Sequence, residues 1–199
     1  MNTLLGMTPD VLREELLRCC HSPAWAGMVI TRMPFASENE IRAAMDEAFV
    51  RLSRSDLLEA IGAHPPIGDK NALREKFAAS GPSWEGEEQA GTRGASESTL
   101  DELAKLNQAY RDKHGYVFLV CATGKSAEEM LAILKDRLPN ERALELTIAG
   151  HELLKIAHLR FGRILEERAA TAAAVVRATV EASAGGKGGR LNNSGRSRL

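Results

Sequence analysis

One long stretch after Pro139 constrains the fold of this chain more than any other feature. It reads as a single helix from about Glu141 into the 170s or 180s. Leu153, Ile156 and Ile164 recur along it at helical spacing and mark one apolar face. This stretch by itself favours a helical fold.

Start and stop signals predict shorter helices elsewhere. Thr8 followed by Pro9 starts a helix that ends near Cys20. Ser37 and Ser126, each with a glutamate three residues later, have the spacing of a capping box and start two more. The segment 21–35, with two prolines and a glycine, is expected to be broken into short pieces.

The remaining signals complete a helical pattern. Ser55 is expected to cap a short helix that stops at Gly62, and residues 100–110 show another helical stripe. Only the run from Tyr116 to Val120 resembles a strand. With one strand candidate and six or more helices, the sequence predicts an all-α, single-domain helical bundle.

Charge divides the chain into parts. The 199 residues have a formal net charge of −1, but residues 185–199 hold four basic residues and no acid, which leaves −5 for the rest. This glycine-rich tail is expected to be disordered, because it cannot bury enough apolar surface to offset the entropy of ordering. We therefore expect a helical domain over 1–168, a helix extension over 169–184 and a basic tail over 185–199.

Composition excludes several classes of protein. A near-neutral chain is not expected to bind nucleic acid, and no apolar run approaches the roughly 20 residues that cross a bilayer. The first residues do not resemble a secretory signal, and three cysteines without a CxxC pair indicate reduced, buried thiols and a cytoplasmic protein. The final Ser197, Arg198 and Leu199 resemble a peroxisomal signal, which would apply in a eukaryote.

Two incomplete motifs argue against a metal or a nucleotide. His151 and Glu152 would begin a zinc-binding HExxH motif, but Lys155 stands where the second histidine belongs. Gly124 and the Lys-Ser after it would end a phosphate-binding loop, but Leu119 stands at its first glycine. We therefore expect neither a zinc site at His151 nor a nucleotide-binding loop at Gly124.

Three positions in the sequence could hold catalytic or ligand-binding side chains. His64 precedes two prolines, so its backbone is stiff, which suits a general acid–base, although a loop histidine without a role is the alternative. Glu88 and Gln89 offer acceptors and a donor fork for a urea-like or imide-like ligand, or they are part of a solvated acidic stretch. Arg160 stands within the apolar stripe of the long helix, where it meets an anionic substrate, pairs with a protein group or extends to solvent.

Six short motifs, in order, resemble one family. They are SPAW (22–25), MPF (33–35), HPPIG (64–68), EEQAG (87–91), YRDKHGYVFLVCATG (110–124) and HLRFGRIL (158–165). Over residues 4–168 the chain resembles the decarboxylases of 2-oxo-4-hydroxy-4-carboxy-5-ureidoimidazoline (OHCU), which act last between uric acid and allantoin. The resemblance implies a helical bundle, usually a homodimer, that works without metal or organic cofactor.

The resemblance also implies the site residues. It makes His64 the catalytic residue and assigns substrate binding to two short segments, to the proline after His64 and to one arginine: Pro65, Glu85, Gly86, Glu87, Glu88, Gln89, Phe118, Leu119, Val120, Cys121, Ala122 and Arg160. The family often has serine where this chain has Glu85. The implied activity is the decarboxylation of OHCU to (S)-allantoin. The alternatives are a non-catalytic helical interaction module and a family member that acts on a related ureido compound.

Overall fold

The computed structural model describes residues 6–64 and 96–185, and within these ranges it contains seven helices and no strand. The all-α class predicted from the sequence is therefore confirmed. No helix in the described ranges is both long and apolar enough to cross a membrane. The helices are α1 (Pro9–Cys20), α2 (Pro23–Ile30), α3 (Glu38–Phe49), α4 (Arg54–Gly62), α7 (Glu97–His114), α8 (Ala127–Arg137) and α9 (Arg142–Gly185).

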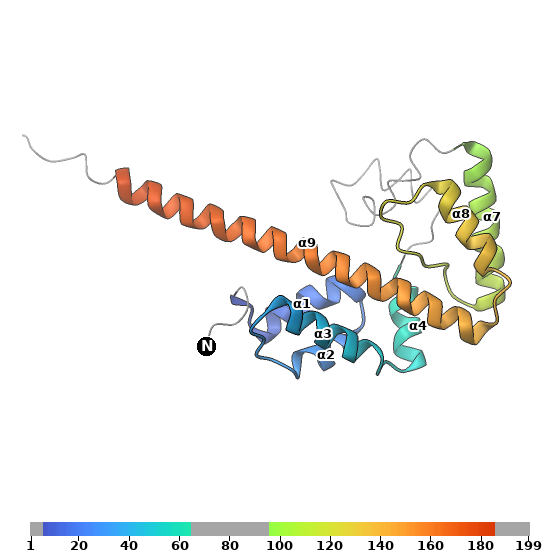
Figure 1. Ribbon diagram of the computed structural model, residues 1–199, viewed down its shortest axis with the longest axis horizontal. Helices are drawn as coiled ribbons and strands as arrows, with labels where there is room; N and C mark the ends of the chain where they lie inside the picture. Colours follow the sequence, from blue (N-terminus) through green and yellow to red (C-terminus); the bar gives the residue numbers. More distant parts are fainter. Residues whose placement is uncertain (1–5, 65–95, 186–199) are drawn as a thin grey trace, which may run out of the picture.

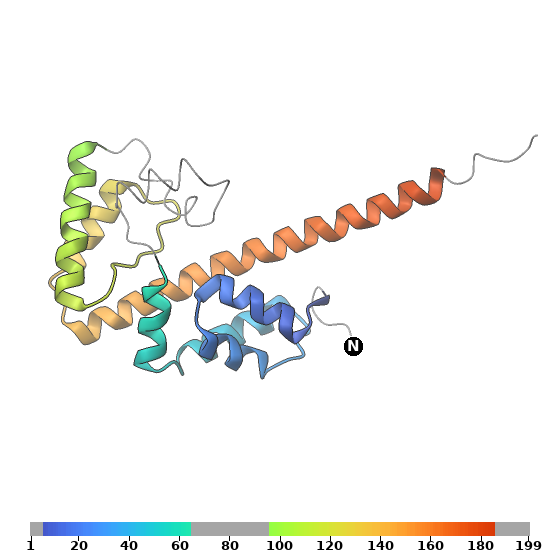
Figure 2. The same cartoon turned by 180° about the vertical axis from the view of Figure 1, so that it is seen from behind.

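Helix α9 is the axis on which the other helices are arranged (Figure 1). Helices α1, α3 and α4 pack against its first half, and α7 pairs with α8 near its N-terminal end. The reverse view in Figure 2 shows that α9 continues away from all of them beyond Glu167 and Arg168, which form ion pairs with α1. The long helix predicted from the sequence is confirmed, and residues 169–181 of it are exposed.

Helix starts follow the capping signals, with one correction. Thr8 caps α1, and Ser126 forms a full capping box with Glu129 at α8. The cap of α4 is Ser53, not the predicted Ser55, because Asp56, three residues after Ser53, accepts the Ser53 N–H and completes the reciprocal pair.

The capping box predicted at α3 is only half formed. Ser37 accepts the N–H of Glu40, as predicted. The Glu40 carboxylate accepts the N–H of Ala36, one residue outside the cap, at 2.8 Å. The first turn of α3 is therefore tied to the residue before its cap.

The segment expected to be broken into pieces contains one continuous helix, α2. Ser22 caps it and Pro23 takes its first position, where a missing N–H costs nothing. Gly27 lies inside the helix and does not end it. Trp25 is fully buried and donates its indole N–H to the carbonyl of Met45 at 3.0 Å, which fastens α2 to α3. Tertiary packing outweighs the weak helix propensity of glycine here.

The core forms where α9 meets α1, α3 and α4. Leu16, Met45, Leu153 and Phe161 are each 0 % exposed. Gly150 allows α9 to approach α4 closely, because a Cβ at this position would stand 3.3 Å from Cδ2 of Leu57 in α4. This packing holds the buried face of α9, including Arg160, in a fixed orientation.

Candidate functional site

His64 lies in the turn directly after α4 and is buried, with 6 % of its surface exposed. Its ring Nδ1 donates to the carbonyl of Ala60 at 2.9 Å, since a carbonyl oxygen can only accept. In the neutral ring this bond places the proton on Nδ1 and the lone pair on Nε2. The ring also meets His21 edge to face, with 5.7 Å between centroids. His64 is thus a buried histidine of defined tautomer.

Arg160 lies in α9 with only 1 % of its surface exposed. Its Nη1 approaches the carbonyl oxygen of Cys19 at 3.5 Å, at the C-terminal end of α1. The last carbonyls of a helix carry partial negative charge, so this end of α1 favours a cation. The alternative that Arg160 extends to solvent is therefore wrong, and the guanidinium is a buried positive charge.

The end of α1 brings His64 and Arg160 into one neighbourhood. His21, which contacts His64, is the left-handed C-cap of α1 at φ 56°, and Cys19, which contacts Arg160, lies two residues before it. Burial raises the pKa of the Cys19 thiol and raises that of Cys20 to about 12, although Arg160 opposes both shifts. Both thiols are therefore protonated at neutral pH and act as packing groups, as the sequence predicted.

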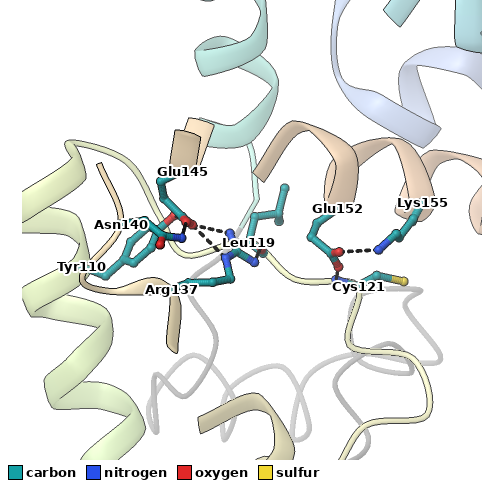
Figure 3. A network of polar contacts seen from close by, with 8 residues as sticks. All are labelled: Tyr110, Leu119, Cys121, Arg137, Asn140, Glu145, Glu152 and Lys155. Carbon is teal, nitrogen blue, oxygen red and sulfur yellow. Dashed lines mark hydrogen bonds and ion pairs between the residues drawn. The ribbon is translucent and has the colours of Figure 1, made fainter. Parts of the chain in front are cut away.

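The segment Phe118–Ala122 is buried along its whole length. It is not a strand, contrary to its sequence pattern, because side chains of α8 and α9 take the bonds that a neighbouring strand would make (Figure 3). Arg137 donates to the carbonyl of Leu119 at 2.9 Å, and the N–H of Cys121 donates to Glu152 at 2.8 Å. Lys125 donates to the carbonyl of Cys121 at 2.8 Å.

A buried ion pair between α8 and α9 supports the segment Phe118–Ala122. Arg137 and Glu145 meet at 2.5 Å, with side chains 7 % and 0 % exposed. The hydroxyl of Tyr110 and the amide of Asn140 also donate to the Glu145 carboxylate (Figure 3). The Arg137 guanidinium lies 4.8 Å from the centroid of the Phe118 ring. The pair is fully hydrogen-bonded, which a buried charge pair requires.

Sequence reasoning missed Arg137, Glu145 and Glu152, although a signal for two of them was present. Arg137 lies on the apolar stripe of α8, three residues after Leu134, as Arg160 lies on that of α9. Glu145 lies on the buried face of α9, four residues before Ala149. A charged residue at a core position is the signal that identified Arg160, and it applies equally to these two.

Six of the predicted site residues lie outside the described ranges: Pro65, Glu85, Gly86, Glu87, Glu88 and Gln89. The part of the predicted site that the structure describes therefore consists of His64, Arg160 and the Phe118–Ala122 segment. An open groove of about 750 Å³ beside Cys121 is lined by Lys155, Leu159 and Arg163 of α9, but neither His64 nor Arg160 lines it. Cys121 of the predicted site therefore borders this groove, whereas His64 and Arg160 lie at the end of α1 and outside it.

The fold and the site define a class of protein: an all-helical domain that buries a histidine of fixed tautomer and an arginine at the same helix end. Residues 6–162 match the family model described as OHCU decarboxylase. The chain belongs to the OHCU decarboxylase family, as its six motifs indicated.

The chain is also similar to individual proteins whose names are consistent with this family. The chain is 34 % identical over 165 residues to the uric acid degradation bifunctional protein TTL of Arabidopsis thaliana, covering 82 % of this chain and 50 % of that protein. It therefore spans about half the length of this relative. It is 28 % identical over 140 residues to the 2-oxo-4-hydroxy-4-carboxy-5-ureidoimidazoline decarboxylase of Haloferax volcanii, covering 70 % of this chain and 80 % of that one.

A solved structure shares the fold. The crystal structure of an OHCU decarboxylase in the presence of (S)-allantoin superimposes with a TM-score of 0.60 at 34 % identity. The match covers 77 % of this chain and 98 % of that chain. The exposed second half of α9 and the basic tail lie beyond the residues that the family model matches.

Proposed function

We propose that this protein decarboxylates OHCU to (S)-allantoin and CO₂, the last step from urate to allantoin. The observation that carries the proposal is the family match over residues 6–162. The buried pair of His64 and Arg160 at one helix end supports it, because an acid–base and a cation suit an anionic substrate.

The chemistry can proceed with side chains alone. When the carboxylate leaves as CO₂, the electron pair of the broken C–C bond passes into the conjugated ring and forms an enolate-like anion. A proton delivered to one face of that anion then gives a single enantiomer of allantoin. The protein has to orient the carboxylate out of the ring plane, stabilise the developing charge and place one proton donor.

Each site residue receives one role in this scheme. His64 exchanges the proton through Nε2, either with the substrate hydroxyl or with the carbanion, while its Nδ1 bond to Ala60 holds the ring in place. Arg160 pairs with an anionic group of the substrate. The backbone of Phe118–Ala122 closes the pocket, and Glu88 with Gln89 holds the ureido and ring N–H groups.

The test uses freshly generated urate oxidase product, which decays spontaneously to racemic allantoin. The purified protein should accelerate this decay and give a circular dichroism signal of one sign as (S)-allantoin forms. If the decay keeps its spontaneous rate and stays optically silent, the chain is a non-catalytic interaction module. A panel of related ureido acids distinguishes a family member with a different substrate, which would turn over one of them faster than OHCU.

Assembly and location complete the proposal. We infer a homodimer, which light scattering of the purified protein should show as twice the chain mass of 21.6 kDa. We also infer a cytoplasmic protein, because its three cysteines, all within the described ranges, are buried and form no disulfide there.

A further inference from the structure

We propose that Glu152 is a positioning residue of this site: its carboxylate fixes the Cys121 peptide, and with it the pocket wall formed by Phe118–Ala122. The inference deepens the proposed function and rests on it. None of the six motifs that carry the family resemblance contains Glu152, and the sequence singled it out only as part of an incomplete zinc motif.

The geometry around Glu152 is that of a strong acceptor with both oxygens used. One oxygen accepts the N–H of Cys121 at 2.8 Å, and the other accepts the ammonium of Lys155 at 2.6 Å (Figure 3). The carboxylate side chain is 13 % exposed, whereas that of Lys155 is 63 % exposed. Burial by itself would raise the pKa of Glu152, but the bonds from Lys155 and Cys121 outweigh it and the pKa is lowered. Glu152 is therefore ionised at neutral pH.

The pocket wall depends on such bonds because it has no strand beside it in the described part of the chain. Buried peptide groups must be hydrogen-bonded, and in a sheet the neighbouring strand would provide this. Here Arg137 donates to the Leu119 carbonyl and Lys125 donates to the Cys121 carbonyl. Glu152 accepts the Cys121 N–H. Glu152 is the only one of these three that accepts, so the two cations cannot replace it.

The position of Glu152 on α9 relates its hydrogen bond with Cys121 to Arg160 of the proposed site. Glu152 and Arg160 lie eight residues apart on one helix, about 12 Å along its axis. Since Arg160 is the cation proposed to hold the substrate, the helix sets the distance between that cation and the pocket wall. A displaced wall would leave the substrate bound but poorly oriented, which lowers kcat more than it raises KM.

The decisive variant is Glu152→Gln, which keeps the shape of the side chain. A glutamine can accept from Cys121 only by turning its NH₂ toward the Lys155 ammonium, so one of the two bonds is lost. We expect kcat to fall about tenfold or more, with KM changed less than about threefold, and the enantiomeric excess of (S)-allantoin to decrease. The matched control is Glu166→Gln, the same change at an exposed position of α9, which should leave all three values unchanged.

A second measurement separates this inference from the proposed function. Amide hydrogen exchange at Cys121 should be at least about tenfold faster in Glu152→Gln than in wild type, with exchange in α1 unaltered. If wild type turns over OHCU but Glu152→Gln matches it in kcat and enantiomeric excess, the positioning role is refuted. If wild type itself is inactive on OHCU, the proposed function fails, and the exchange data still report whether Glu152 fixes the segment.

Discussion

The imidazole of His64 stands edge to face against the ring of His21, with the ring planes at 80° and the centroids 5.7 Å apart. This contact joins the turn after α4 to the C-cap of α1. The same end of α1 meets Arg160 through the carbonyl of Cys19. Two residues separated by 96 positions therefore share one structural support, and the predictions below test what each contributes.

Replacing His64 should remove catalysis and leave the fold intact. In His64→Asn, the side chain keeps a polar group near Ala60 but has no titratable nitrogen to exchange the proton. Accelerated formation of optically active allantoin should fall by about 10²-fold or more, within the range of a lost general acid–base. The far-ultraviolet dichroism spectrum should match wild type. Wild-type turnover in this variant would show that His64 is not the acid–base.

Removing the charge of Arg160 should weaken substrate binding. Arg160→Met keeps most of the side-chain volume and therefore avoids the cavity that alanine would leave. Loss of a charge-assisted hydrogen bond worth about 1.5–3 kcal/mol corresponds to an increase in KM of about 10- to 150-fold. Initial-rate kinetics over a range of OHCU concentrations measure this change. An unaltered KM would mean that Arg160 only caps the end of α1.

Removing one partner of the Arg137–Glu145 ion pair should destabilise the protein more than removing both. Glu145→Leu leaves the Arg137 charge buried without its acceptor, which costs about 3–5 kcal/mol and lowers Tm by on the order of 10 °C. Adding Arg137→Met in the same chain should recover much of that loss, because no buried charge then remains. Thermal denaturation of both single variants and the double variant measures the coupling. Simple additivity would contradict the assignment.

Acidification should destabilise the protein through His114. This histidine is buried against Tyr110 and Tyr116, and burial lowers its pKa from the ordinary value near 6.5. The unfolded chain then binds the proton more readily, so the contribution of His114 is complete above about pH 6.5 and decreases below it. Tm measured from about pH 8 to 5 should fall less in His114→Phe than in wild type. Parallel curves would show that other groups cause the fall.

The sequence pointed to some residues of the proposed site and not to others, for a physical reason. His64 was found because its prolines mark a stiff turn, and Arg160 because a charge interrupts an apolar stripe. Glu152 was not found, since it lies at an ordinary helix position and its role depends on Cys121, 31 residues away in the chain. A side chain that bonds a distant peptide group leaves no local pattern.

The sequence by itself determined the helical class, most helix starts, the long α9 and the family, because caps and 3.6-residue periodicity are local properties. Tertiary structure alone decided that Tyr116–Val120 is not a strand and that α2 continues through Gly27. It also decided which group each buried charge meets. These outcomes depend on partners that are remote in the chain. The partner decides the outcome in the interior, because leaving a buried polar group without a hydrogen bond costs more free energy than local propensity can offset.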